Sequence, residues 1–154
     1  MIGNVDQTDR PGARTITVSA VVLTRRDGAV AVVRKRGTDR FMLAGGKAEP
    51  GETPRRCAVR EIGEELGLTL DADALTYLGR YETDTANEPG FRLVSEVFAA
   101  TSDAPAAPAA EIAEARWLSR CEFEALVALP EDDCAPWAPL LVRVAHEQLT
   151  AHED

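Results

Sequence analysis

The spacing of apolar residues along the chain predicts a mixture of strands and helices. Residues 15–23 are rich in β-branched side chains and predict a strand. The Asp27-Gly28 pair that follows is a strong hairpin signal, so residues 29–33 are expected to return as the next strand. The other predicted strands are short apolar runs at residues 41–43, 75–81, 91–100 and 116–118.

The clearest helix is predicted to begin at Thr53 and to end at residue 66. Thr53 suits the N-cap, Pro54 suits the first helical position, and Gly67 is placed to end the helix. Two further helices are expected at residues 122–129 and 137–151. Strands and helices interleave without the regular βαβ alternation of a Rossmann sheet, which favours a mixed α/β or α+β sandwich. We expect residues 1–13 to be a flexible N-terminal arm and residues 14–150 to form one domain.

The length and charge of the chain limit the classes of partner. Its 154 residues suit one domain with one core. The sequence has 17 Lys and Arg against 26 Asp and Glu, a formal net charge of −9. Because no basic surplus is available to neutralise phosphates, we expect neither a nucleic-acid polymer nor an anionic membrane as a partner. A small phosphorylated substrate is compatible with an acidic protein if a divalent metal ion bridges the two.

Cysteine spacing and the distribution of apolar residues bear on the compartment. Cys57, Cys121 and Cys134 show neither CxxC nor Cys/His spacing, which predicts free thiols and no zinc site. The first 14 residues lack an apolar signal region, and no apolar run approaches the roughly 18 residues that a membrane span needs. These features predict a cytoplasmic protein with reduced thiols.

The clearest predicted helix carries the candidate chemistry. At about 100° per residue, Glu61, Glu64 and Glu65 fall within an arc of roughly 100° on one face. The small Cys57 and Ala58 flank them and are expected to leave access for a ligand. An amphipathic helix with a solvated acidic face is the alternative explanation. However, like charges at i and i+4 repel, and negative charge near a helix C-terminus is unfavourable. A bound cation would offset both effects, and oxygen ligands without His or Cys favour Mg²⁺ or Mn²⁺.

This helix and the glycine-rich segment before it resemble the Nudix box. The box reads Gly, five residues, Glu, seven residues, then Arg-Glu-apolar-any-Glu-Glu-any-Gly-apolar. Here Gly46 and Glu52 are followed by residues 60–68, REIGEELGL, and every fixed position matches. The resemblance implies an α/β fold, a Nudix-like α/β/α sandwich with a central mixed β-sheet in a single domain. One departure is Ala44, where family members often carry proline before the paired glycines.

The resemblance also implies roles for individual residues. The positions that hold Mg²⁺ (or Mn²⁺) in the family correspond here to the backbone carbonyl of Gly46 and the side chains of Glu61, Glu64 and Glu65. Glu61 matches a position that ligates the metal or acts as the base, depending on the member. Glu52 and Arg60 would hold the loop and the helix together through ion pairs. Apart from the resemblance, Arg60 lies four residues before Glu64 on the predicted helix and can pair with it. The family attacks phosphorus with a water that the metal activates.

Many family members supply one more acidic residue from a loop well after the box. Glu111 is the better candidate for this extra metal ligand and catalytic residue, and Glu114 is the alternative, since both shortly precede Trp117. Glu96, within a predicted strand, is a further candidate. An exposed acid with no part in catalysis is the competing explanation for each.

Three other residues are candidates for substrate contacts. Arg34 belongs to the basic cluster at residues 34–36 and has the bidentate geometry that suits phosphate, although a solvated strand end is the alternative. Lys47 lies inside the box loop, where it either contacts phosphate or remains at the surface. Phe41 is placed to stack on a base or to pack in the core.

Together these features predict a Mg²⁺-dependent Nudix pyrophosphohydrolase that cleaves a phosphoanhydride bond in a small nucleotide. The sequence lacks the downstream marks of the ADP-ribose and diadenosine polyphosphate branches, so elimination favours a MutT-like nucleoside triphosphate pyrophosphatase. One alternative is an ADP-ribose or sugar-nucleotide pyrophosphatase within the family. Another is a Nudix-fold module that binds a nucleotide or sugar nucleotide without turnover. Family members are often homodimers, so a homodimer is an expected state.

Overall fold

The computed structural model describes residues 14–85 and 89–150. The predicted N-terminal arm, residues 1–13, lies outside the described residues. In chain order the elements are β1 (Arg14–Thr24), β2 (Val30–Lys35), β3 (Ala44–Gly46), α1 (Pro54–Leu66), the 3₁₀ turn η1 (Ala72–Ala74), β4 (Thr76–Asp84), β5 (Phe91–Thr101), β6 (Ile112–Leu118), α2 (Arg120–Ala125), the 3₁₀ turn η2 (Leu126–Ala128) and α3 (Pro139–Thr150).

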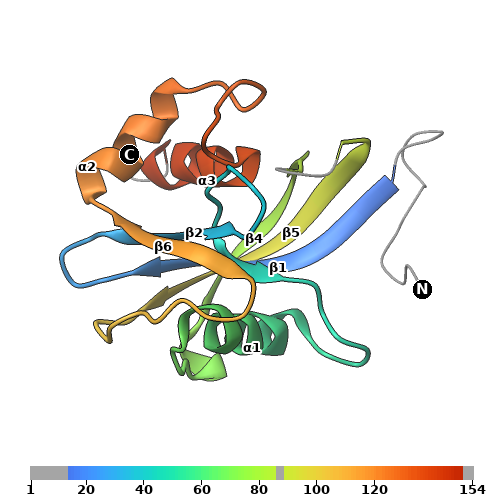
Figure 1. The fold of residues 1–154 in the computed structure, drawn as a ribbon, viewed down its shortest axis with the longest axis vertical. Coiled ribbons are helices and arrows are strands. Elements are labelled where there is room, and N and C mark those ends of the chain that lie inside the picture. Colours follow the sequence, from blue (N-terminus) through green and yellow to red (C-terminus); the bar gives the residue numbers. More distant parts are fainter. Residues whose placement is uncertain (1–13, 86–88, 151–154) are drawn as a thin grey trace.

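A mixed β-sheet forms the centre of the fold. Its strand order is β4-β5-β1-β2-β6, and β3 pairs with β1 outside this path. Strands β1 and β5 run parallel along their whole length, whereas the other pairs are antiparallel. Helix α1 covers one face of the sheet, while α2 and α3 lie on the opposite face (Figure 1). The structure therefore confirms the predicted α/β sandwich around a mixed sheet.

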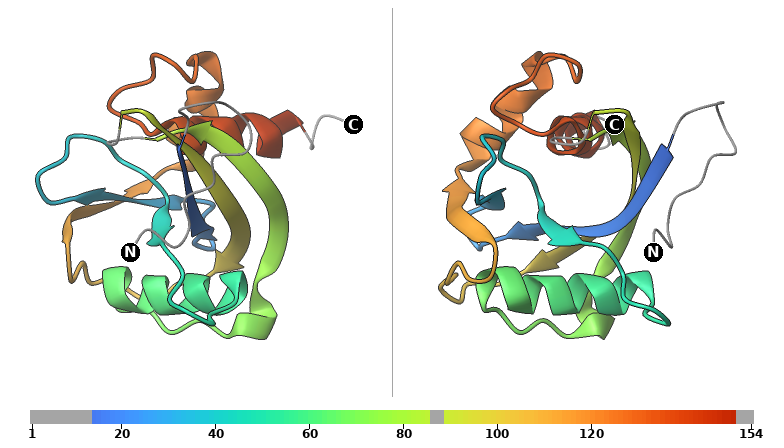
Figure 2. Two further views of the ribbon diagram at one scale, coloured as in Figure 1. Left: turned by 90° about the vertical axis from the view of Figure 1, so that its right-hand side faces the viewer. Right: turned by 45° about the vertical axis from the view of Figure 1, so that its right-hand side comes forward.

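The central strands are apolar on both faces because helices cover both. In β1, Ala20 and Val22 belong to the core on the side of α2 and α3, whereas Val21 and Leu23 belong to the core beneath α1. Strand β2 repeats this alternation, which explains the near-continuous apolar runs in the sequence. Two turned views show β4 and β5 curving from the side of α1 toward α3 (Figure 2). This curvature brings β4 into contact with α3.

Helix α1 begins and ends as the local sequence predicts. The Thr53 side chain accepts a hydrogen bond of 3.2 Å from a backbone N–H in the first turn, and Pro54 follows as the first helical residue. Gly67 ends the helix with a φ of +68°, a conformation that glycine adopts without strain. Ile62 and Leu66 are fully buried against the sheet, and each contributes about 1.5–3 kcal/mol of apolar burial.

The strand predicted at residues 41–43 is wrong in its position. The structure places β3 at Ala44–Gly46, while Phe41 and Met42 form only isolated bridges. The glycines pair with β1 because they allow a very close backbone approach. A Cβ added at Gly45 would lie 2.0 Å from the backbone oxygen of Ser19, so no larger residue fits there.

The C-terminal boundaries also differ from the prediction. Strand β6 begins at Ile112 rather than at residue 116, since it pairs with β2 along nearly its whole length. Ser119 and Glu122 form a capping box that starts α2 at Arg120, and the 3₁₀ turn η2 completes this segment. Helix α3 begins at Pro139, slightly later than expected. Among the described residues, no helix has the length and apolar character required to cross a membrane.

Candidate active site

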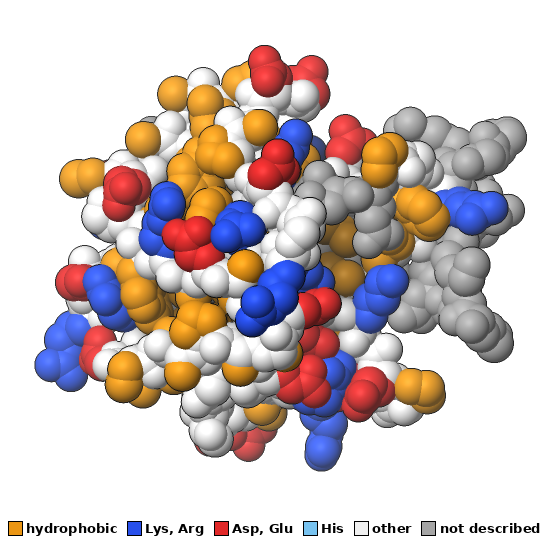
Figure 3. Space-filling view, in the orientation of Figure 1, with side chains coloured by type: hydrophobic (Ala, Val, Ile, Leu, Met, Phe, Trp, Pro, Cys, Tyr) orange, Lys and Arg blue, Asp and Glu red, His pale blue; other side chains and the backbone are white. Residues whose placement is uncertain are grey.

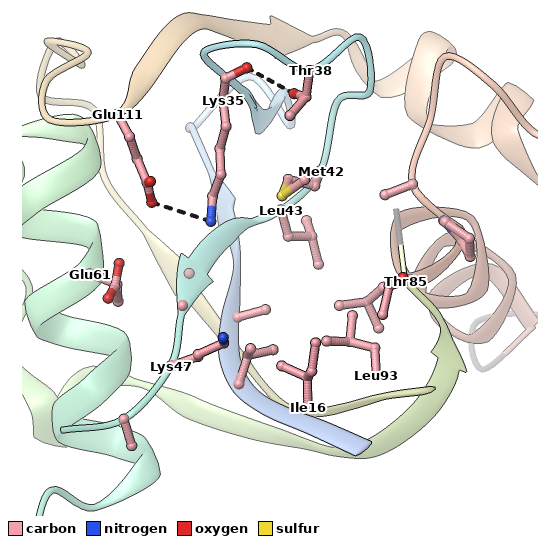
Figure 4. A pocket seen from close by; sticks show the side chains of 18 of the residues that line it. Ile16, Lys35, Thr38, Met42, Leu43, Lys47, Glu61, Thr85, Leu93 and Glu111 are labelled. Atoms are coloured by element: carbon pink, nitrogen blue, oxygen red, sulfur yellow. Dashed lines mark hydrogen bonds and ion pairs between the residues drawn. The ribbon is translucent and has the colours of Figure 1, made fainter. Parts of the chain in front are cut away.

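A pocket of about 750 Å³ lies between the sheet, the start of α3 and the loop after β3 (Figure 4). Small-molecule sites typically have volumes of about 300–1,000 Å³. Its polar end is lined by Lys35, Lys47, Glu49, Arg60, Glu61 and Glu111. Its other end is lined by the aliphatic side chains of Ile16, Val18, Ala20, Leu43, Leu93 and Leu140. The pocket therefore offers charge at one end and apolar contact at the other.

Three side chains of α1, spaced one turn apart, contact the glycines of β3. Cys57, Glu61 and Glu65 follow each other at intervals of four residues and so share one ridge of the helix. The Cys57 thiol donates to the Gly46 carbonyl oxygen at an S···O distance of 3.2 Å, and the Gly45 N–H donates to Glu65 Oε1 at 2.9 Å. A Cβ added at Gly46 would lie 2.6 Å from the carboxyl carbon of Glu61. Glycine at these two positions thus lets β3 pass directly over both carboxylates.

Both of these carboxylates are withdrawn from solvent. Glu65 is 2% exposed, and its Oε2 atom has no hydrogen-bond partner among the described residues. Burial raises the pKa of Glu65 to about 7, and burial likewise raises the pKa of the Glu61 carboxyl. Glu61 lines the pocket and Glu65 lies behind Gly45, which also lines it. Acids with perturbed pKa values beside a pocket are typical of functional sites. The expectation that Cys57 and Ala58 leave open access beside the carboxylates is wrong, because both are fully buried.

Arg60 links the remaining acids of the box. Its guanidinium donates to both carboxylate oxygens of Glu52, at 2.7 and 2.9 Å, in the bidentate geometry of strong charged pairs. It also contacts Glu61 at 3.0 Å and Glu64 at 3.2 Å. The hydrogen bonds from Arg60 lower the pKa of Glu52 to about 2. The predicted pairs of Arg60 with Glu52 and with Glu64 are therefore confirmed, while Glu64 itself is half-exposed.

Glu111 and Lys35 form an ion pair at the polar end of the pocket. Lys35 Nζ lies 3.3 Å from Glu111 Oε1 (Figure 4). The backbone on both sides holds Glu111 in place: its carbonyl accepts from the Arg36 N–H at 2.8 Å, and the nearby Ala109 N–H donates to the Glu65 carbonyl at 3.0 Å. The loop before β6 is thus attached to the end of α1, and Glu111 lines the same end of the pocket as Glu61.

Glu52, Glu64 and Glu65 of the box do not line the pocket, and neither do four other candidates. Arg34 pairs with Glu114 at 3.5 Å on the β2–β6 ladder. Phe41 is 6% exposed and packs in the core, and Glu96 accepts a hydrogen bond of 2.6 Å from the Tyr77 hydroxyl. The face turned to the viewer in Figure 3 intermingles basic and acidic side chains, consistent with such pairing. None of the four lies where it would contact a ligand in the pocket.

Lys35 is a pocket residue that the sequence did not single out. The sequence shows a basic cluster at residues 34–36, in which Arg34 is the predicted substrate contact. The β2–β6 ladder shifts register between Arg34 and Lys35, so strand alternation did not identify the side chain that faces the pocket. The aliphatic end was missed for a related reason, because it combines residues of β1, β5 and α3 that are distant in sequence.

The donor set at the polar end is suited to a hard divalent ion. Within residues 14–85 and 89–150, no group of three or more Asp, Glu, His or Cys side chains is arranged to hold a metal ion. Arg60 engages Glu61 and Glu64, and Lys35 engages Glu111. All candidate donors are nevertheless oxygen atoms, and Glu65 Oε2 is buried with no hydrogen bond to any residue that the structure describes. Oxygen donors of this kind fit Mg²⁺ or Mn²⁺.

Comparisons with known proteins agree on one family. The family model described as NUDIX domain matches residues 13–138. The chain is 36% identical over 134 residues to the uncharacterized Nudix hydrolase orf19 of Rhodococcus erythropolis. This alignment covers 79% of this chain and 71% of that protein. It is 43% identical over 99 residues to the uncharacterized Nudix hydrolase PA4841 of Pseudomonas aeruginosa, covering 64% of this chain. That alignment spans 53% of the Pseudomonas protein, so this chain matches only about half of its length.

Solved structures show the same fold at low sequence identity. The MutT protein of Methanosarcina mazei superposes with a TM-score of 0.66 at 18% identity, covering 88% of this chain and 95% of that one. The MutT NUDIX hydrolase of Burkholderia pseudomallei gives a TM-score of 0.65 at 24% identity, covering 88% and 98%. At this level of identity the similarity concerns the arrangement of strands and helices.

Proposed function

The chain belongs to the Nudix family of hydrolases, which act on anhydride bonds, and we propose that it is a Mg²⁺-dependent pyrophosphohydrolase of nucleoside triphosphates. One observation carries the proposal. Two desolvated carboxylates, Glu61 and Glu65, are packed under Gly45 and Gly46, and Glu61 and both glycines line a pocket that has charged side chains at this end and aliphatic ones at the other. A small substrate with charge at one end and an apolar group at the other matches this division.

The proposed metal site consists of oxygen donors on α1 and β3. Glu61, Glu64, Glu65 and the Gly46 carbonyl oxygen would hold the ion, with Glu111 as a further donor. When bound, Mg²⁺ supplies positive charge to phosphate oxygens and makes a nearby water more acidic. The partnerless Oε2 of Glu65 and the proximity of Gly46 to the Glu61 carboxyl support this assignment. Manganese, which favours the same donors, is expected to substitute.

The protein's own side chains would position the reactants and move the proton. Glu61 faces the pocket, where its carboxylate would take a proton from the attacking water. The water oxygen then bonds to phosphorus while the anhydride P–O bond breaks. Arg60 and Glu52 hold the box loop against α1 through their bidentate pair. Lys35 and Lys47 line the polar end and would contact phosphate oxygens.

The aliphatic lining of the pocket favours a substrate with a nucleobase at this end over one with a second sugar. Its aliphatic side chains can pack against the flat faces of a base. A sugar nucleotide or ADP-ribose brings a second hydroxyl-rich ring, most of whose polar groups would be desolvated without partners against the aliphatic side chains. Thr38, Asp84 and Thr85 are the other polar residues of the lining, and Thr85 lies beside Leu93 (Figure 4). We therefore propose nucleoside triphosphates as the substrate class.

Turnover of a substrate panel tests this function. The full chain is incubated with nucleoside triphosphates, ADP-ribose, sugar nucleotides and dinucleoside polyphosphates, with Mg²⁺ or with chelator, and products are separated by chromatography. We expect hydrolysis of nucleoside triphosphates that stops when the metal is removed. Glu61→Gln should lower kcat by roughly 100-fold or more, because general-base catalysis contributes about 10²–10⁴. The matched control Glu96→Gln, outside the pocket, should retain activity.

Three other outcomes of these experiments would contradict different parts of the proposed function. Preferred hydrolysis of ADP-ribose or of a sugar nucleotide would keep the reaction and overturn the substrate class. Thermal stabilisation by a nucleotide without any product would indicate a binding module. Full activity in Glu61→Gln would remove Glu61 from the proposed mechanism.

A further inference from the structure

The Cys57 thiol lies directly against the backbone that the proposed metal site uses. Cys57 is fully buried on the first turns of α1, and its Sγ is 3.2 Å from the Gly46 carbonyl oxygen. The thiol is the donor in this contact, since the carbonyl can only accept. The contact joins residues eleven positions apart, so the fold and not the local chain brings them together.

The surroundings of the thiol favour a single direction for its hydrogen. Arg60 Nη2 approaches Sγ at 3.9 Å as a donor. The Ser19 side chain, 2% exposed on β1 and paired in register with Gly46, also hydrogen-bonds the thiol. The sulfur therefore accepts from its neighbours while its own hydrogen is directed to the Gly46 oxygen. The thiol thus connects β1, β3 and α1 at one point.

Other groups beside this carbonyl also point to a ligand. Glu65 Oε2 is buried and has no hydrogen-bond partner in the described part of the chain, while the other oxygen of the same carboxylate accepts from the Gly45 N–H. On the opposite side, the Glu61 carboxyl packs against the α-carbon of Gly46. The Gly45-Gly46 segment is consequently held between the Cys57 thiol and the carboxylates of Glu61 and Glu65.

We infer that Cys57 is a positioning residue, whose hydrogen bond sets the orientation in which the Gly46 carbonyl oxygen ligates a divalent ion. The inference rests on the proposed function, because it assumes the metal site described there. A carbonyl oxygen has two lone pairs, so it can accept from the thiol and still bind a cation. Glycine restrains its own peptide weakly, so the thiol adds to the pairing of Gly46 with Ser19 in holding the carbonyl in one direction.

Divalent-ion affinity of the full chain tests the role of the thiol apart from turnover. Mn²⁺ binding is measured by the electron paramagnetic resonance signal of the free ion, for wild type, Cys57→Ala and Cys57→Ser. Loss of an outer hydrogen bond to a metal ligand typically weakens affinity about 10–100-fold, and for a weak thiol donor we expect about tenfold in Cys57→Ala. Cys57→Ser keeps a donor and should bind within about threefold of wild type, because serine restores the hydrogen bond.

Cys134→Ala provides the matched control. Cys134 is also buried, at 1% exposure, and its thiol also donates to backbone carbonyls, at 3.2 and 3.3 Å, but it lies outside the residues that line the pocket. Removal of this thiol should leave Mn²⁺ affinity unchanged even if the melting temperature falls. Should Cys57→Ala not fold, Cys57→Val fills the volume without a donor and should show the same loss of affinity.

The outcomes separate the inference from the function on which it rests. Wild-type affinity in Cys57→Ala would overturn the positioning role while leaving the metal site intact. Equal weakening in Cys57→Ser and Cys57→Ala would overturn it in favour of packing alone, and so would equal weakening in Cys134→Ala. A wild-type chain that binds no Mn²⁺ would overturn the metal site and the inference together.

Discussion

The burial of Glu65 should make the metal-free protein less stable as pH rises. Its pKa is about 7 in the folded protein against a usual value of 4.5. Below pH 4.5 the group is protonated in both the folded and unfolded states and costs nothing. As pH rises toward 7, the unfolded chain ionises more readily than the folded one, so stability is lost. A difference of about 2.5 pKa units corresponds to a total loss of about 3 kcal/mol in the free energy of unfolding. Most of this loss, about 2–3 kcal/mol, occurs between pH 5 and pH 8.

Glu65→Gln removes this ionisation without changing the shape of the side chain. The amide oxygen can still accept from the Gly45 N–H, which is 2.9 Å from Oε1 in the wild-type protein. The amide nitrogen then occupies the position of the partnerless Oε2, which costs about 1–3 kcal/mol at every pH. We expect the variant to be less stable than wild type at pH 5 and to equal or exceed it at pH 8.

Urea unfolding in the presence of chelator, at pH 5 and pH 8, measures how the free energy of unfolding changes with pH in the wild type and in Glu65→Gln. Saturating Mg²⁺ at pH 8 should then stabilise the wild type, by about 3 kcal/mol at a hundredfold excess over Kd, and the variant much less. Glu122→Gln is the control, because hydrogen bonds from Ser119 lower the pKa of Glu122 and place its titration in more acidic solution. Parallel pH curves for wild type and Glu65→Gln would refute the reasoning from burial.

Three further predictions concern the polar end of the pocket. Gly46→Ala should fold but lose most metal affinity and activity, because its Cβ displaces the flexible Glu61 carboxyl. Gly45→Ala should unfold at a lower urea concentration than wild type, because its Cβ meets the rigid backbone of β1. Metal affinity and urea midpoints distinguish the two variants, and equal behaviour would contradict the geometry. Arg60→Lys should lower kcat/KM about 10–100-fold, since lysine cannot form the bidentate pair with Glu52, and an unchanged kcat/KM would show that this pair does not matter. Glu111→Gln should reduce turnover less than Glu64→Gln or Glu65→Gln, and a Glu111→Gln enzyme as active as wild type would remove Glu111 from the site.

The features that the sequence predicted correctly depend on neighbouring residues. Thr53, Pro54 and Gly67 define the ends of α1 through contacts within a turn of the chain. The i, i+4 spacing predicted the contact between Arg60 and Glu64, and the box motif implied the pair with Glu52. The mixed sheet and its two helical layers also follow the expected order of elements. Local propensity and a specific motif were sufficient for this part of the fold.

The features that were missed depend on pairing between distant strands. Glu65 was expected on an accessible acidic face, but β3 covers that edge of α1 and buries it. The position of β3 itself depends on the close approach of Gly45 to β1, which a local reading of paired glycines assigns to a turn. Lys35 faces the pocket after a register shift that no local pattern records. The homodimer and the cytoplasmic location remain predictions.

The parallel pairing of β1 with β5 also affects the order in which the pocket forms during folding. Strand β3 and helix α1 are close in sequence, so the contacts of the glycines with the carboxylates close only a short loop. The aliphatic end, in contrast, joins Ile16 of β1 to Leu93 of β5, and the register that aligns them pairs Arg14 with Phe91. Long loops must lose entropy before such contacts stabilise the chain, and parallel strands therefore pair slowly. A nascent chain released before β5 can contain every residue of the box and still lack the wall against which a base would pack.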